Sequence, residues 1–284
     1  MPGMLYLVPT PIGNLGDISA RCRQTFAQAD FIAAEDTRVT LKLLNYLELK
    51  KPLVSYYEHN KAERGPRIVS RILDGETCVL VSDAGSPAIS DPGEDLVRLC
   101  AEAGIPVCAI PGPCALVTAL SASALPTGRF CFEGFLSINK KSRQAHLTSL
   151  KNEQRTMIFY EAPHKLLATL IDFAQTFGPG RKITLCRELT KLHEEYYRTT
   201  LGEAVTHYTE TPPRGEFVLV LAGAEAVPDE APTMEQAVAR VQALLAEGQS
   251  KKDAVKQTAK ETGLAKNALY EAVLQAGREE TMQN

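Results

Sequence analysis

Three segments rich in glycine, proline and small polar residues could form a ligand pocket. They are residues 9–17 (PTPIGNLGD), 82–93 (SDAGSPAISDPG) and 111–115 (PGPCA), and each follows an apolar run of strand character. Ligands of parallel α/β folds bind beyond the carboxyl ends of strands, so we expect a binding site where these segments begin. The second segment is longer than the roughly two to six residues of most such connections, which favours a binding role. The first lacks the G-x-G-x-x-G pattern and contains two prolines without amide hydrogens, which argues against a nucleotide phosphate.

Two neighbouring acidic residues are candidates for proton transfer. Glu35 and Asp36 follow another predicted strand, and Arg38 stands two positions later. A positioned carboxylate can accept a proton from a hydroxyl group, which makes Glu35 and Asp36 candidate catalytic residues. The same acids before Thr37 are also typical of a helix N-cap, and both roles remain open. Glu188, with basic residues around it, forms a second cluster that is more typical of a surface salt bridge.

Basic residues gather in two stretches of a chain that is acidic overall. The 284 residues carry a formal net charge of −3, so a nucleic-acid partner would have to be attracted by local patches. Residues 139–155 contain five basic side chains against Glu153, and residues 250–270 contain five lysines against Asp253 and Glu261. Clustered charge of this kind could bind phosphates, and a solvated helix face is the alternative for both stretches. We favour RNA for residues 139–155, whereas the two interpretations are equal for residues 250–270.

Alternating strand and helix patterns predict an α/β fold that positions these residues. Strand-like runs fall at residues 5–8, 31–34, 53–56, 78–81 and 107–110, and again at 130–135, 156–160, 183–186, 196–201 and 217–221. The first set predicts a parallel sheet. The second set, with a helix from His164 to Phe177, predicts a mixed sheet because its last two strands have only a short connection. Residues after Gly223 are typical of a linker that leads to three short helices. We therefore expect domains at 1–118, 119–226 and 234–280, the last with a helix-turn-helix outline.

Composition excludes several classes of protein. With 44% hydrophobic and 23% charged residues, the chain is typical of a globular protein rather than a disordered or fibrous one. Seven cysteines without a C-x-x-C pair and five histidines without metal spacing predict neither disulfides nor a metal site. Prolines interrupt the uncharged stretch 105–128, and no export signal is evident, so we expect a cytoplasmic protein without a membrane segment.

The order of the motifs resembles one enzyme family along almost the whole chain. The sequence is similar to the ribosomal RNA small-subunit methyltransferase I family, a branch of the tetrapyrrole-methylase class of S-adenosylmethionine enzymes. The motifs that carry this resemblance are VPTPIGNLGDIS, AAEDTR, LVSDAGSPAISDPG, IPGPCA, CFEGFL, IFYEAPHK, RELTK, GEFVLV and KNALY.

The resemblance implies an α/β fold of two tetrapyrrole-methylase-type domains, with S-adenosylmethionine in the cleft between them and a small C-terminal helical appendage. It also implies methylation of the ribose 2′-hydroxyl of a cytidine in the decoding region of 16S rRNA, on the assembled 30S subunit, by a homodimer. RNA contacts are expected at Arg38, Lys140, Lys141 and Arg143. The positions that match the class's cofactor contacts are Pro11, Ser82, Asp83, Ala84, Gly85, Ser86, Ile89, Cys114, Ala115, Tyr160, Glu161 and Leu189.

Two departures from the wider class bear on the substrate. Tetrapyrrole enzymes usually have Gly-Asp-Pro where this chain has Gly85-Ser86-Pro87, and Gly-Pro-Gly-Asp where it has Asn14-Leu15-Gly16-Asp17. These differences argue against a porphyrinoid substrate and leave the cofactor unaffected. A tetrapyrrole-type small-molecule methylase and a non-enzymatic ribosome assembly factor remain the alternatives.

Overall fold

The computed structural model describes residues 3–91, 93–225 and 233–282, with side chains described as far as residue 276. The chain divides into two compact units, Met1–Ala224 and Glu225–Asn284. The predicted domain boundary at residue 118 falls inside a helix of the first unit, and the division of that unit into two domains stays a prediction. The predicted linker after Gly223 lies for the most part outside the described residues.

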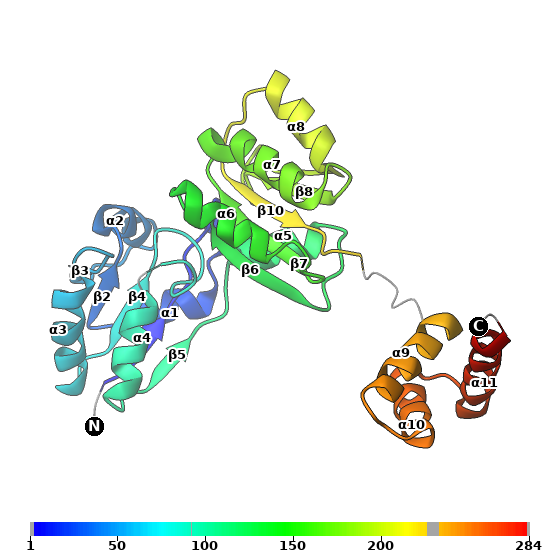
Figure 1. Cartoon of the computed structure of the whole chain (residues 1–284). Coiled ribbons are helices and arrows are strands. Elements are labelled where there is room, and N and C mark those ends of the chain that lie inside the picture. Colours follow the sequence, from blue (N-terminus) through cyan, green and yellow to red (C-terminus); the bar gives the residue numbers. More distant parts are fainter. Residues whose placement is uncertain (1–2, 92, 226–232, 283–284) are drawn as a thin grey trace. The chain divides into compact units, whose positions relative to one another are not determined.

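A parallel five-stranded sheet forms the first half of the first unit (Figure 1). Its order is β3-β2-β4-β1-β5, which confirms the predicted parallel α/β architecture. The strands β2 and β4 are fully buried, as expected for apolar strands covered on both faces. The five strands are β1 (Leu5–Leu7), β2 (Phe31–Ala34), β3 (Leu53–Ser55), β4 (Cys78–Val81) and β5 (Val107–Ala109).

Helices cover both faces of this sheet. Cys22 and Phe26 of α1 (Ala20–Gln28) and Leu43 and Leu44 of α2 (Thr37–Tyr46) pack on one face. Buried side chains of α3 (Lys61–Leu73) and α4 (Gly93–Glu102) pack on the other. A short 3-10 helix, η1 (Leu15–Asp17), precedes α1.

The second half of the unit is a mixed sheet with the order β6-β7-β10-β8-β9. Its strands are β6 (Phe130–Phe135), β7 (Thr156–Glu161), β8 (Lys182–Arg187), β9 (Glu195–Thr200) and β10 (Phe217–Leu221). Only β6 and β7 are parallel; the other pairs are antiparallel, so the predicted mixed sheet is confirmed.

The expected short connection between the last two strands is wrong. A ten-residue helix, α8 (Leu201–Glu210), joins β9 to β10. It begins with a capping box in which Thr200 and Glu203 bond reciprocally, and it buries Leu201, Ala204 and Tyr208 at helical spacing. The short connection is instead the one between β8 and β9.

Helices from different parts of the chain cover the two faces of the mixed sheet. Leu147 of α6 (Lys140–Ser149), the apolar stripe of α7 (Pro163–Phe177) and α8 share one core with the strands. On the opposite face, Leu116, Ala119 and Leu120 of α5 (Ala115–Ala122) pack against β7, β8 and β10. Thus α5, which directly follows the first sheet, covers the second.

The second unit contains three helices in its described part, as the sequence predicts. They are α9 (Met234–Ala246), α10 (Lys251–Thr262) and α11 (Lys266–Met282). Val241, Leu244, Val255, Leu269 and Val273 form its core with smaller side chains. The turn between α10 and α11 begins at Gly263, whose φ of 71° is the left-handed conformation that glycine tolerates best.

Candidate functional site

The three glycine- and proline-rich loops meet at one edge of the parallel sheet. They leave β1, β4 and β5, and these strands are neighbours in the order β4-β1-β5. The Thr10 amide donates to the Gly85 carbonyl at 2.9 Å, and the Gly85 amide donates to the Thr10 carbonyl at 3.0 Å. The Ser86 hydroxyl donates to the Pro113 carbonyl at 3.0 Å. Hydrogen bonds to backbone carbonyls therefore tie the second loop to both others.

The second loop has an unusual and well-fixed backbone. Ala88 and Ser90 adopt φ values of 67° and 65°, a conformation that non-glycine residues rarely take. Asp91 stabilises it, because its Oδ1 accepts hydrogen bonds from the amides of Ala88 and Gly93, both at 2.8 Å. Backbone strain of this kind is concentrated at ligand sites.

A cavity of about 590 Å³ lies between these loops and residues of the mixed sheet. Its size is within the range of small-molecule and cofactor pockets. Phe135, Tyr160, Leu189 and residues 216–218 contribute its wall from the second sheet. Of the positions expected to contact a cofactor, those that line the cavity are Ser82, Asp83, Ala84, Gly85, Ser86, Ile89, Cys114, Ala115, Tyr160, Glu161 and Leu189.

Pro11 is the exception among these positions. It lines a smaller cavity of about 230 Å³, which shares Ser82 and Asp83 with the main one. Its neighbour Ile12 lines the main cavity instead.

The lining of the main cavity is strongly acidic. It contains five carboxylates, from Glu35, Asp83, Asp91, Glu161 and Glu216, and no lysine or arginine among the described residues. Only Glu216 has a cationic partner, Lys191, whose Nζ lies 2.8 Å from its Oε2. The cavity therefore favours a positively charged ligand and disfavours an anion.

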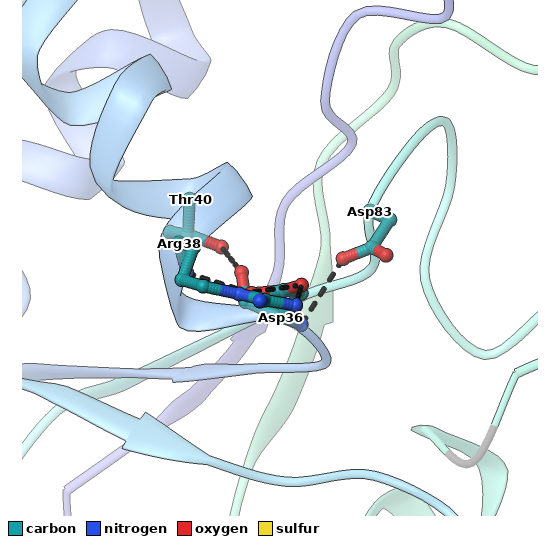
Figure 2. A network of polar contacts seen from close by, with 4 residues as sticks. All are labelled: Asp36, Arg38, Thr40 and Asp83. Carbon is teal, nitrogen blue, oxygen red and sulfur yellow. Dashed lines mark hydrogen bonds and ion pairs between the residues drawn. The ribbon is translucent and has the colours of Figure 1, made fainter.

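Figure 2 shows the polar network around Asp36 at the first turn of α2. Asp36 is the N-cap of this helix and accepts the Arg38 amide at 2.8 Å, so the capping role is confirmed. Its carboxylate also binds the Arg38 guanidinium at 2.6 Å, and these hydrogen bonds lower the pKa of Asp36 to about 2. Asp36 does not line the cavity, but its amide donates to Asp83 Oδ1 at 3.0 Å and so positions an acid that does.

Glu35 differs from its neighbour in both position and proton affinity. It lines the cavity, and burial raises the pKa of its carboxyl, with a further contribution from the charges of Asp83, Asp91 and Asp36. A hydrogen bond from the Asp83 amide to Glu35 Oε2 at 3.4 Å acts in the opposite direction on this pKa. Glu35 is thus the better proton acceptor of the two candidates.

Glu161 is a buried carboxylate held by its surroundings. It is 5% exposed and accepts hydrogen bonds from the Thr169 hydroxyl and, at 2.9 Å, from the Ala162 amide. Arg143 of α6 donates to the same Thr169 hydroxyl oxygen at 2.8 Å and pairs with Asp172 at 2.6 Å. A chain of polar contacts therefore leads from α6 to the cavity wall.

These polar contacts bear on the residues expected to bind RNA. The Arg143 side chain is 12% exposed and its guanidinium is engaged inside the fold, which argues against its grouping with free surface cations. Lys140 and Lys141, by contrast, are exposed at the start of α6. Arg38 is 86% exposed, although it is paired with Asp36.

Comparison with known proteins places the chain in a family. A model described as Tetrapyrrole (Corrin/Porphyrin) Methylases matches residues 4–205, and an RsmI C-terminal HTH domain matches residues 232–277. A protein of Synechocystis sp. named ribosomal RNA small subunit methyltransferase I is 48% identical over 275 residues, which is 96% of this chain and 98% of the relative. One of the same name from Bacillus subtilis is 44% identical, covering 95% and 94%. The chain belongs to the ribosomal RNA small subunit methyltransferase I family.

Solved structures confirm the tetrapyrrole methylase fold of this family member. The methyltransferase CobJ aligns with a TM-score of 0.59 at 19% identity, over 78% of this chain and 95% of that one. A uroporphyrin-III C-methyl transferase from Thermus thermophilus complexed with S-adenyl homocysteine aligns with a TM-score of 0.55 at 17% identity, over 78% and 97%.

Several residues of this family member's cavity were missed in the sequence. Asp91 was within reach, since an aspartate followed by proline and glycine is a turn signal. Phe135, His164 and Glu216 belong to motifs of the family resemblance, but only the sheet pairing shows that these motifs surround one space. The other missed lining residues are Ile12, Ser90, Ala162, Pro163, Phe217 and Val218.

The second acidic cluster has a structural role. Lys191 Nζ lies 2.9 Å from Glu188 Oε1 and also pairs with Glu216, while Arg187 pairs with Glu195 at 2.8 Å. The interpretation of this cluster as salt bridges is confirmed.

The described residues include no group of three or more His, Cys, Asp or Glu side chains placed to hold a metal ion. Within the same residues, no helix is both long and apolar enough to cross a membrane.

Proposed function

We propose that this protein transfers a methyl group from S-adenosylmethionine to the ribose 2′-hydroxyl of a cytidine in the decoding region of 16S rRNA, on the assembled 30S subunit. The observation that carries this proposal is the acidic cavity, which is built from three loop backbones on one side and the second sheet on the other. The relatives from Synechocystis and Bacillus support it, because both are named ribosomal RNA small subunit methyltransferase I.

The residues of the cavity fit this cofactor. S-adenosylmethionine carries a sulfonium and an ammonium group, and the unpaired carboxylates of Asp83, Asp91 and Glu161 offer these charges favourable surroundings. Ile89 and Leu189 supply apolar surface for the adenosine. Because Gly85 has no side chain, a ligand can come close to the backbone of the second loop at this residue. We assign cofactor binding to these residues together with Ser82, Ala84, Ser86, Cys114, Ala115 and Tyr160. We also assign Pro11, which lines the smaller cavity that shares Ser82 and Asp83 with the main one.

The bound cofactor would supply an electrophilic methyl group to the reaction. The ribose oxygen would form the new bond to carbon as the bond from carbon to sulfur breaks, and the hydroxyl proton must leave the oxygen. We assign the role of proton acceptor to Glu35, because this carboxyl lines the cavity and burial raises its pKa. Asp36 would act through its amide bond to Asp83 rather than as a proton acceptor.

The charge of the cavity also weighs against the tetrapyrrole alternative. Porphyrinoid substrates of the uroporphyrin type carry several carboxylates, which a cavity with five acids and no lining lysine or arginine among the described residues would repel. RNA would present only an uncharged ribose and base to the cavity, while its phosphates stay outside.

Methyl transfer from labelled S-adenosylmethionine tests the proposal directly. The wild-type protein is offered 30S particles, free 16S rRNA and a uroporphyrinoid, and we expect label in the 30S particles. Label in the uroporphyrinoid would establish the small-molecule alternative, and no label in any of them would favour an assembly factor. We expect Glu35→Gln to reduce the rate by about 10²- to 10⁴-fold at unchanged cofactor affinity. Glu210→Gln, at an exposed carboxyl at the end of α8, is the matched control.

RNA contacts outside the cavity are proposed at Lys140, Lys141 and Arg38. We expect Lys140→Ala/Lys141→Ala to weaken methylation of 30S particles without a change in cofactor affinity, and a wild-type rate would make these lysines a solvated face. Arg143, which the sequence grouped with them, is left out of this test because its loss would disturb Asp172 and Thr169.

We also propose a cytoplasmic homodimer. Light scattering is expected to give twice the monomer mass of 31.0 kDa, and the monomer mass would remove the dimer.

A further inference from the structure

A second cavity lies in the C-terminal helical unit. It has a volume of about 660 Å³ and is lined by the first residues of α10 and by the first two turns of α11. We call it the tail groove and define it by Lys251, Lys252, Lys266, Asn267, Tyr270 and Glu271.

The lysines of the tail groove have no acidic partner. Lys251, Lys252 and Lys266 are exposed, and none of them forms an ion pair with any described residue. Nearby acids are engaged elsewhere in the unit: Glu261 pairs with Arg240, and Asp253 accepts the Ser250 hydroxyl at 2.6 Å. With Glu271 as the one acid among its lining residues, the groove has a local excess of positive charge.

The backbone adds to this charge. Both α10 and α11 begin at the groove, so the positive ends of two helix dipoles lie near the lysines. Such a site attracts an anion with several separate charges more strongly than a single carboxylate.

An aromatic side chain narrows the choice of anion. Tyr270 is 42% exposed, which is high for a large ring, and it follows Lys266 by four residues on the same face of α11. Lysines beside an exposed ring are the combination that holds single-stranded nucleic acid, because the cations contact phosphates while a base stacks on the ring. Asn267 offers an amide to a base edge.

We propose that the tail groove binds single-stranded RNA, with its lysines on consecutive phosphates and one base stacked on Tyr270. This inference extends the proposed function, because it gives the C-terminal unit its own contact with the RNA substrate. It also differs from the basic stretch 139–155, where Arg143 is engaged within the fold and Arg155 is paired with Glu153.

Fluorescence anisotropy with the full-length protein and a labelled single-stranded RNA of about a dozen nucleotides tests the groove over a range of salt concentrations. The groove variant is Lys252→Ala/Lys266→Ala. Its matched control is Lys256→Ala/Lys260→Ala, which removes the same charge from exposed positions of α10 that do not line the groove.

We expect the groove variant to lose at least tenfold in affinity at low salt, and its slope of log affinity against log salt to become shallower by about 1.4, or 0.7 for each lost phosphate contact. The control should bind as the wild type does. Equal losses in both variants, or no loss in the groove variant, would overturn the groove as a site.

Tyr270 tests the stacking. We expect Tyr270→Ala to weaken binding by about 5- to 150-fold and Tyr270→Phe to retain most of it, since the ring alone supports stacking. A Phe variant as weak as the Ala variant, or tighter binding of duplex than of single-stranded RNA, would refute this part. Cofactor affinity, measured by calorimetry, is expected to be unchanged in every groove variant. Because RNA binding is measured without methylation, a protein that methylates no substrate can still confirm the groove, and an active enzyme with an inert groove would refute it.

Discussion

Gly112→Ala probes the contact that sets the distance between two of the cavity loops. A Cβ atom at residue 112 would lie 2.5 Å from Pro9 Cγ and 3.1 Å from Pro9 Cβ. A proline ring cannot rotate away, so the loop after β5 must move by about 1 Å to restore an ordinary contact. Overpacking of this kind costs about 1–3 kcal/mol, which for a unit of this size corresponds to a melting temperature lower by roughly 2–12 °C.

The same displacement should reach the cofactor site. Gly112 is followed closely by Cys114 and Ala115, which line the cavity. We therefore expect calorimetry with S-adenosylmethionine to show weaker binding by Gly112→Ala, alongside the lower melting temperature measured by circular dichroism.

Gly128→Ala is the matched control, because a Cβ atom there meets nothing within 4 Å. We expect its free energy of unfolding to be equal to that of the wild type or higher by up to about 1 kcal/mol. The double variant Pro9→Ala/Gly112→Ala should recover part of the lost stability, since it removes the ring that causes the clash. If Gly112→Ala has the same melting temperature as Gly128→Ala and the same cofactor affinity as the wild type, the contact between Gly112 and Pro9 does not set the distance between these two loops.

Substitutions at three further positions test the residues in and around the site separately. Asp36→Asn should keep most of the melting temperature and activity because its amide oxygen can still cap α2, whereas Asp36→Ala should lower the melting temperature; an inactive but stable Asn variant would mean that Asp36 handles a proton. Burial raises the pKa of Glu35, so the folded state favours its protonated form, and the stability this gives is lost as the pH rises through the raised pKa. The melting temperature of Glu35→Gln should therefore rise relative to that of the wild type as the pH increases from the ordinary pKa of 4.5 to the raised one, and a constant difference would contradict the raised pKa. Arg143→Ala should lower the free energy of unfolding by about 1.5–3 kcal/mol, because Asp172 and Thr169 lose their hydrogen bonds from Arg143. An unchanged free energy in urea unfolding would mean that Arg143 behaves as an ordinary surface cation.

Local sequence patterns were sufficient for most helices and strands and for the loops of the cavity. The run at 78–81 is apolar throughout, and the structure buries all four of its residues as the central strand β4. A capping and a catalytic role were both open for Asp36 in the sequence, and the hydrogen bond from the Arg38 amide confirms the cap. Helix α8 was not predicted, although its capping box stands in the sequence at Thr200 and Glu203 and the expected strand 196–201 ends only one residue inside the helix.

By itself, the sequence determined what depends on neighbours along the chain: the strand and helix periodicity, the glycine and proline turns, the charge balance and the order of the family's motifs. Only the tertiary structure decided which of these segments share a space. The strand order β4-β1-β5 brings three loops together that are separated by about a hundred residues, and the pairing of β7 with β10 adds Glu216 to the same wall. Burial decided the rest, since two arginines of the same basic stretch look alike in sequence, yet Arg143 is held by Asp172 and Thr169 inside the fold while Arg155 pairs with Glu153 at the surface. The contacts of Arg143 join residues 26 and 29 positions apart, and no local pattern encodes them.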